Sequence, residues 1–348
     1  MKIVVVRPGA MGDILFTTPA LRALKKKHPG SHVTYVLMRK WRFLLRGNPY
    51  VDRVVGLRYR DPAALGRWAR ETYDLLINLH EVEDAARICQ AIPARERRGH
   101  QWIDGRLQPD GNSHDFLARE EAWRRLHESG THYPELFCRI AGVQADSYRY
   151  DFEPGAVAAW RARRFLKRRG LGRPPLPVAL HLYSRGSPSK RWSPESATEV
   201  TRILEGQRFL VLGYKRDREH TRPLENLPNV TVTCAGMRAQ AEMLRRCALF
   251  VGIDSGPRHV ASAMGTPVLC LFGPRPKSLL PKFPNEEALE VNELCAPCFE
   301  ETCPLGRDCM GQIRPERIAE AIRRMLIRSR SRTDGEQTSP ANPKAPRR

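Results

Sequence analysis

Short apolar runs alternate with amphipathic stretches along most of this 348-residue chain. The first run, Ile3 to Val6, is continuous and β-branched, which is typical of a strand buried on both faces of a parallel sheet. Runs of the same kind predict further strands at residues 33–37, 53–57, 75–79, 178–182, 209–212, 230–233, 249–251 and 268–272. The strand–helix–strand order predicts an α/β protein with doubly wound sheets.

The segments between these runs carry apolar residues at helical spacing. Ile14, Leu15, Leu21 and Leu24, for example, fall on one face and predict a helix that ends at the cations 25–27. The same reasoning predicts helices over residues 39–46, 63–71, 117–126, 134–140, 157–168, 194–204, 216–224, 238–247 and 316–327, and one more helix whose last residues are 87–91. Residues 100–116 are polar and aperiodic, so we predict a long loop over a cleft.

Residues 170–177 are rich in Gly and Pro, and the strand–helix pattern restarts after them. We therefore predict two Rossmann-like domains, residues 1–169 and 170–328, which face each other across a cleft. Residues 329–348 are basic and have no apolar face, so we predict a disordered tail.

The composition is that of a globular protein, with 41% hydrophobic residues and no apolar run long enough to cross a bilayer. The first residues do not resemble a signal peptide, so we expect a cytoplasmic protein, and a monomer. The formal charge of +21 fits nucleic acid, an anionic membrane surface or a phosphorylated substrate. No nucleic-acid-binding signature is present, so we expect no nucleic acid and favour the inner face of the cytoplasmic membrane. An Arg-rich composition without any partner is the alternative.

The stretch from Leu249 to Ala261 has the pattern of a strand, a small polar turn and the start of a helix. Pro257 suits the first helical position because its φ is preset and its missing N–H is not needed there. The free N–H groups of the first turn, with Ser255 and Gly256 before them, predict an anion site at the carboxyl edge of the sheet. The alternative is an ordinary turn in which Asp254 or Ser255 caps the helix.

Three loops of the second half follow predicted strands, at residues 183–192, 213–219 and 254–259. The first loop contains Ser184, Ser187 and Lys190, and hydroxyls with a cation suit phosphate oxygens. Because parallel strands end at one edge of a sheet, we expect the three loops to lie side by side. The sequence therefore predicts a site for a phosphate-bearing ligand.

In the first half, the strand at Ile3 to Val6 ends in a loop that contains Gly9 and Gly12, which let the backbone turn tightly and approach a ligand. Their spacing differs from the dinucleotide fingerprint G-x-G-x-x-G, which argues against NAD binding. Asp13 follows at the start of a helix. It is either an N-cap or, if it lies beside a cleft, a general base.

Five motifs then occur in order along the chain. They are Met11-Gly12-Asp13-Ile14-Leu15, Thr17-Thr18-Pro19-Ala20-Leu21, Lys190-Arg191-Trp192, Asp254-Ser255-Gly256-Pro257-Arg258-His259 and Phe272-Gly273-Pro274. Together with Gly213 and Glu219 they resemble glycosyltransferase family 9, the lipopolysaccharide heptosyltransferases, from Met1 to about Leu326. The resemblance implies a GT-B fold, with the acceptor on the first domain and an ADP-sugar on the second. It also implies an inverting, metal-independent transfer of a heptose from ADP-heptose to the inner core of lipopolysaccharide.

The resemblance assigns roles to individual residues. Asp13 matches the general base, and Gly9, Met11 and Gly12 lie on the acceptor side. Lys190 matches the cation that steadies the diphosphate. The other predicted donor-binding residues are Glu219, Asp254, Ser255, Gly256 and His259, together with Ser184 and Ser187 of the hydroxyl-rich loop described above.

Within the donor site, Glu219 matches an acid that holds the ribose, while Ser255, Gly256 and His259 meet phosphate oxygens as charge builds on the leaving ADP. Arg258 stands where the family often has an apolar residue. It either adds a phosphate contact or reaches solvent.

Four cysteines form a separate group within fifteen residues, at Cys295, Cys298, Cys303 and Cys309. Four thiols suit a tetrahedral zinc site, although the paired C-x-x-C repeat of a zinc ribbon is absent. We predict a structural zinc site beneath the donor site, with free thiols or an iron–sulfur cluster as the alternatives.

Two function classes follow from these observations. The first is the heptosyltransferase, or a relative that uses another nucleotide-sugar. The second is a nucleotide-sugar epimerase or binding protein on the same scaffold, which would need no acceptor. A non-enzymatic adaptor ranks below both.

Overall fold

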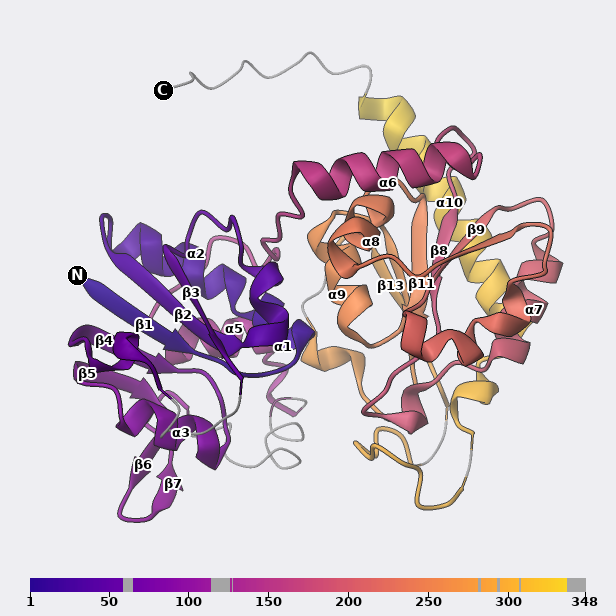
Figure 1. Cartoon of the computed structure of the whole chain (residues 1–348). Coiled ribbons are helices and arrows are strands. Elements are labelled where there is room, and N and C mark those ends of the chain that lie inside the picture. The colour runs from indigo at the N-terminus through magenta and orange to yellow at the C-terminus, as the bar shows by residue number, and fades with distance from the viewer. Residues whose placement is uncertain are drawn as a thin grey trace.

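The computed structural model describes residues 1–58, 65–113, 126, 128–280, 283–292, 295–306 and 308–336. Two parallel sheets organise the chain, one in each half (Figure 1). None of the helices in these ranges is long and apolar enough to cross a membrane.

The first sheet has the strand order β3-β2-β1-β4-β5. Its strands are β1 (Lys2–Val6), β2 (His32–Met38), β3 (Arg53–Leu57), β4 (Tyr73–Asn78) and β5 (Ala94–Gly99). Alternate residues of β1 enter two different cores. Ile3 and Val5 pack with residues of α1 (Met11–Phe16), α2 (Thr18–Lys27) and α5 (Tyr133–Ile140), whereas Val4 and Val6 pack with residues of α3 (Glu83–Gln90). Burial on both faces explains why β1 is hydrophobic from Ile3 to Val6, whereas Lys2 at its start is exposed.

The second sheet has the order β10-β9-β8-β11-β12-β13. Its strands are β8 (Val178–His181), β9 (Phe209–Leu212), β10 (Val230–Thr233), β11 (Leu249–Ile253), β12 (Val268–Phe272) and β13 (Glu286–Glu290). One core contains residues of α6 (Ala156–Arg168), α8 (Met237–Leu244) and α9 (Gly256–Ala263), and the other contains residues of α7 (Pro194–Ile203) and α10 (Pro315–Glu336). The strand order reverses between β8 and β11, and ligands of such sheets bind at this reversal.

The predicted strands are all present, but several predicted helices are wrong. Residues 39–46 contain the 3₁₀ helix η1 (Arg39–Leu44), and residues 65–71 contain the 3₁₀ helix η3 (Arg67–Arg70). Residues 216–224 form two 3₁₀ segments, η5 (Lys215–His220) and η6 (Arg222–Leu224). Pro223 lies inside the second, and a proline cannot donate the N–H that a continuous α-helix needs at this point.

The predicted loop at residues 100–116 is also wrong over its first half. β6 (Gln101–Ile103) and β7 (Arg106–Gln108) form an antiparallel hairpin that contacts α3. Asp104 and Gly105 turn the chain with positive φ angles of 50° and 73°. The hairpin lies at the lower end of the first half and away from the second half (Figure 1). The helix predicted at 117–126 lies outside the described residues except for Leu126.

The strands β5 and β13 were not predicted, because both are polar edge strands. Their sequences, ARERRG and EEALE, lack an apolar run. Charged side chains at a sheet edge prevent pairing with another chain, and they also remove the hydrophobic signal of a strand.

The last helix extends further than predicted. α10 continues to Glu336, so residues 329–336 of the expected disordered tail are helical, and residues 337–348 lie outside the described residues. α6 also differs in its packing partner. It precedes the predicted domain boundary, yet it packs against α8 of the second half.

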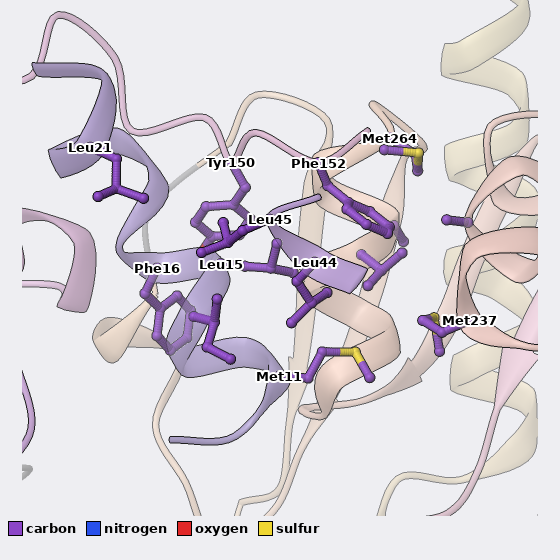
Figure 2. Packing of buried hydrophobic residues seen from close by; sticks show 14 of the residues in the cluster. Met11, Leu15, Phe16, Leu21, Leu44, Leu45, Tyr150, Phe152, Met237 and Met264 are labelled. Carbon is purple, nitrogen blue, oxygen red and sulfur yellow. The ribbon is translucent and has the colours of Figure 1, made fainter. Parts of the chain in front are cut away.

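A single hydrophobic cluster connects the two halves. Figure 2 shows part of it, with Met11 and Phe16 of α1 near Tyr150, and with Met237 and Met264 from the second half. A cavity of about 1010 Å³ opens beside this cluster. Residues of both halves line it, including Phe43 and Arg46 on one side and Met237 and Arg238 on the other.

Candidate active site

The N-terminal ends of α1 and α9, from opposite halves of the chain, contact each other directly. A Cβ atom added to Gly12 would lie 2.7 Å from Cδ2 of His259, and one added to Gly256 would lie 2.9 Å from Sδ of Met11. Two glycines therefore permit this close approach. The contact joins the motif that contains Asp13 to the motif that contains Asp254.

Asp13 is the third residue of α1, and its carboxylate accepts a hydrogen bond from the N–H of Ala10 at 2.8 Å. Asp13 is thus not the N-cap itself but the acidic partner of the N-cap backbone. Its other carboxylate oxygen lies 3.6 Å from Nη2 of Arg7. Gly9 leaves room for this side chain, because a Cβ there would lie 2.6 Å from Oδ2 of Asp13. The Asp13 side chain is still 29% exposed, so a ligand can reach it.

Arg7 is a buried cation beside Asp13, and the sequence analysis missed its role. It follows β1, and it donates hydrogen bonds to the carbonyl of Leu79 and to the carboxylate of Glu81. Nδ1 of His80 lies 3.2 Å from the Arg7 guanidinium and 3.0 Å from the Glu81 carboxylate. Because β1 pairs with β4, the residues that follow the two strands meet at one edge of the sheet. The order of the predicted strands could therefore have indicated that Arg7 lies near His80 and Glu81.

Burial and the neighbouring charges determine which of Arg7, His80 and Glu81 are protonated. Burial by itself would raise the pKa of Glu81, but the Arg7 charge and the hydrogen bond with His80 bring it well below the ordinary value. Burial and the Arg7 charge lower the pKa of His80. Near neutral pH, Glu81 is therefore an anion, His80 is neutral and Arg7 is a cation shared between two carboxylates.

Lys190, Asp254 and His259 form the second charged group. Lys190 ends the 3₁₀ helix η4 (Pro188–Lys190), and its ammonium donates to Oδ2 of Asp254 at 3.0 Å and to the Asp254 carbonyl at 3.2 Å. Nε2 of His259 lies 3.5 Å from Oδ1 of Asp254. Two of the three N–H donors of Lys190 are thus directed at Asp254, so an incoming phosphate must compete with this carboxylate.

Burial would raise the pKa of Asp254, but the Lys190 charge and the hydrogen bond with His259 hold it well below its ordinary value. Burial lowers the pKa of His259, and the Arg258 charge acts in the same direction. The imidazole is therefore neutral near pH 7. A neutral imidazole offers one N–H donor and one acceptor nitrogen to its surroundings.

Arg258 neither contacts solvent nor is free for a phosphate, which corrects both alternatives from the sequence. Its guanidinium is buried and donates to the carboxylate of Glu286 on β13. Nη1 also lies 3.1 Å from Nδ1 of His259. Arg258 thus links α9 to the edge strand and orients the imidazole.

Two aromatic rings of the first half enclose His259. The Phe16 ring packs edge-on against the imidazole, with centroids 4.7 Å apart, and the Tyr150 ring does so at 6.0 Å. These contacts desolvate the imidazole. The sequence did not reveal them, because Tyr150 lies far from both motifs in the chain.

The turn before α9 is not capped by its own side chain. Ser255 occupies the N-cap position, but it makes no side-chain capping bond, and its hydroxyl lies 3.2 Å from Nδ1 of His181. The Asp254 carboxylate is engaged by Lys190 and His259. The alternative of an ordinary capped turn is therefore wrong for these two side chains.

The first two loops lie side by side, as predicted. The Tyr183 ring stacks on the His220 ring at 3.9 Å, and the Arg191 guanidinium lies over Tyr183. Glu219 is 79% exposed and its carboxylate lies 3.2 Å from Nε2 of His220. Ser184 and Ser187 contribute carbonyls to the loop, which accept from Nε of Arg191 and from the N–H of Lys190.

The cysteine segment lies against the same loop. Ser189 donates to the carbonyls of Glu300 and Glu301, and the Cys309 thiol points at the Ser189 carbonyl. Burial and the neighbouring thiols of Cys298 and Cys303 raise the pKa of Cys309. Cys295 is exposed, and the described residues contain no group of three or more ligands placed to hold a metal. The thiols of Cys298, Cys303 and Cys309 lie near one another beside this loop, and the structural zinc site stays a prediction.

The family model described as Glycosyltransferase family 9 (heptosyltransferase) matches residues 63–308. The chain belongs to glycosyltransferase family 9. Among curated proteins, the family 9 chain is 24% identical to lipopolysaccharide heptosyltransferase 1 of Pseudomonas aeruginosa, with 94% of this chain and 98% of that protein covered. Membership makes the protein a glycosyltransferase of the heptosyltransferase family.

Solved structures agree with the fold of family 9. The family 9 glycosyltransferase of Veillonella parvula superposes with a TM-score of 0.74 at 22% identity, over 94% of this chain and 97% of that chain. E. coli heptosyltransferase WaaC, solved with ADP-2-deoxy-2-fluoro heptose, superposes with a TM-score of 0.62 at 19% identity, over 93% and 99%. The predicted GT-B fold is confirmed.

Proposed function

We propose that this family 9 protein transfers a heptose from ADP-heptose to the inner core of a lipopolysaccharide precursor, with inversion at the anomeric carbon. The observation that carries the proposal is the contact between Gly12 and His259, which joins the helix of Asp13 to the turn of Asp254. A carboxylate on one side and a cation with a helix N-terminus on the other are the two parts that such a transfer needs. The solved WaaC, named with an ADP-heptose analogue, supports the choice of donor.

In the proposed reaction, the acceptor hydroxyl attacks the anomeric carbon while Asp13 accepts its proton. A carboxylate suffices as base, because the hydroxyl becomes acidic only as the new bond forms. The bond between the anomeric carbon and the diphosphate oxygen breaks, and ADP leaves with the electron pair. Arg7 keeps the Asp13 carboxylate in place, and Glu81 balances the Arg7 charge.

Negative charge on the leaving ADP falls on groups of the second half. Lys190 and the N–H groups at the start of α9 stabilise it, and the neutral His259 adds a hydrogen bond. As the phosphates bind, they replace Asp254 as the partner of Lys190. Ser184, Ser187 and the exposed Glu219 belong to the proposed donor site, with Glu219 at the ribose.

Because the proposed acceptor is a lipid, the protein is expected to act in the cytoplasm at the inner membrane surface. We expect donor and acceptor to be its partners. ADP-sugar is a substrate in this proposal, and the residues named above supply the chemistry without a cofactor.

The proposal is tested with Asp13→Asn, since the amide keeps the hydrogen bond from Ala10 but cannot accept a proton. We expect acceptor-dependent ADP release to fall on the order of a thousandfold, within the range of general-base effects. ADP should still raise the melting temperature by mass action. Asp84→Asn, on the exposed first turn of α3, is the matched control.

Wild-type turnover by Asp13→Asn would disprove the base assignment. ADP-heptose that is consumed or isomerised without any acceptor would instead favour the epimerase. A thermal-shift series over ADP-, UDP- and GDP-sugars identifies the nucleotide, and stabilisation by a non-ADP sugar alone would contradict the donor.

A further inference from the structure

Helix α6 has one buried and one exposed face. Ala158, Ala162 and Leu166 are buried at a spacing of four residues and belong to the core that includes α8. The opposite face carries Val157 and Trp160, whose exposed fractions are 66% and 55%. Figure 1 shows α6 along the upper edge of the molecule, outside the sheet that it covers.

The exposed side of α6 is strongly basic. Its cations are Arg161, Arg163, Arg164, Lys167 and Arg168, all exposed, and the helix contains no acidic residue. In the part of the chain that the structure describes, none of the five has a carboxylate partner. This positive charge is therefore not balanced by the fold itself.

Several basic side chains on or beside other helices do have carboxylate partners. Lys26 of α2 pairs with Asp146, Arg246 next to α8 pairs with Glu242, and Arg324 of α10 pairs with Glu287. Arg317 and Arg323 of α10 donate to backbone carbonyls instead, but that helix also carries acidic residues, whereas α6 carries none. An unbalanced row of cations attracts an anionic partner.

We propose that α6 is the surface through which this protein binds an anionic membrane. An exposed Trp on a basic helix is typical of the interface between lipid headgroups and acyl chains. The Arg164 guanidinium lies 5.5 Å from the Trp160 ring centre, so the cation is held where it meets lipid phosphates as the ring enters the interface. Two apolar side chains insert weakly, so charge supplies most of the attraction and salt reverses the binding.

Docking through α6 would also place the large cavity at the membrane. Ala158 and Phe165 of α6 line that cavity, together with Phe43 and Met237 from the two halves. A lipid-anchored acceptor would then reach the space between the halves without leaving the bilayer. The docking inference stands on α6 alone, because membrane binding is measured without donor or acceptor.

The test is co-sedimentation of the full chain with vesicles of phosphatidylcholine alone, or with about one third phosphatidylglycerol. Wild-type protein should bind only the anionic vesicles and be released by salt. Arg164→Glu with Arg168→Glu should weaken binding on the order of a hundredfold, since each basic residue near the surface contributes several-fold. Trp160→Ala should weaken it about fivefold.

The matched controls replace basic and apolar side chains at exposed positions outside α6. Arg106→Glu with Arg222→Glu makes the same change in net charge at two other exposed positions, and Ile103→Ala removes an exposed apolar side chain. These variants should keep most of the binding. Equal losses in the α6 and control variants would overturn the proposal. Binding to DNA or RNA but not to vesicles would overturn it, as would a dimer in solution that Trp160→Ala dissociates.

Discussion

Lys190 and Asp254 form an ion pair at the start of α9, with Nζ 3.0 Å from Oδ2. The two side chains are 16% and 18% exposed, so water weakens the pair only in part. The cation proposed to bind the donor diphosphate is thus already bound to a carboxylate. Donor binding and the stability of this turn are therefore coupled.

Lys190→Met should destabilise the protein and weaken ADP binding together. Removing one partner of a largely buried pair leaves a carboxylate uncompensated, which costs about 2–3 kcal/mol after allowance for the partial exposure. Loss of a charge-assisted bond to phosphate should weaken ADP binding about tenfold or more. Urea unfolding and ADP titration measure the two effects.

Lys26→Met is the control for this prediction. Lys26 and Asp146 also form an ion pair, at 2.9 Å, but their side chains are 70% and 75% exposed. We expect a change below about 1 kcal/mol and unaltered ADP binding. Equal destabilisation by the two variants would contradict a buried role for Lys190.

Gly12→Ala and Gly256→Ala should differ in cost, although both glycines lie in the contact between α1 and α9. The Cβ at position 12 would meet the buried His259 ring, which Phe16 and Arg258 hold in place. The Cβ at position 256 would meet Sδ of Met11, a flexible side chain that can move.

We expect Gly12→Ala to cost about 1–3 kcal/mol, as overpacking usually does, and Gly256→Ala to cost less. Chemical denaturation of both variants beside wild type measures the difference. A larger cost at Gly256 would mean that Met11, and not His259, is the rigid partner of this contact.

His181 should make stability depend on pH. It is 3% exposed, and burial lowers its pKa to about 4 from an ordinary value near 6.5. Between these two pH values, His181 is protonated in the unfolded chain but neutral in the folded chain. The free energy of unfolding therefore decreases as the pH falls from 6.5 to 4.

Between pH 7 and pH 5, the His181 contribution should fall by about 2 kcal/mol. The His181→Gln variant should lose that much less stability than wild type over the same interval, as measured by urea midpoints at the two pH values. Asp254 and Glu81, whose folded pKa values are depressed, act at lower pH, because their stabilisation is lost only below their unfolded pKa values. If wild type and His181→Gln lost the same stability between the two pH values, the pH dependence would not come from His181.

The central strands of both sheets could be predicted, because the apolar run that indicates each of them lies within a few consecutive residues. Ile3 to Val6 of β1 and all residues of β9 and β12 are buried on both faces, so these positions are apolar and form continuous runs in the sequence. β5 and β13 could not be predicted, because these two edge strands are rich in charged residues and lack an apolar run.

Part of the candidate site could be predicted in the same way. Lys190, Asp254 and His259 follow neighbouring parallel strands or begin the next helix, so topology alone brings them together. Asp13 was predicted as a site residue from the motifs that resemble the family. The zinc site read from the cysteine spacing stays a prediction; in the structure Cys309 points at the Ser189 carbonyl and Cys295 is exposed.

The amino-acid sequence by itself determined the α/β class, the two sheets, the family and the loops that carry the charged residues, because hydrophobic runs and short motifs are local properties. The tertiary structure alone decided which charges are paired. Arg7 meets Glu81 across 74 residues of chain, and Arg258 meets Glu286 on an edge strand that no pattern indicated. Pairing depends on the distance between side chains after folding, and burial then determines which of those charges remain available to a ligand.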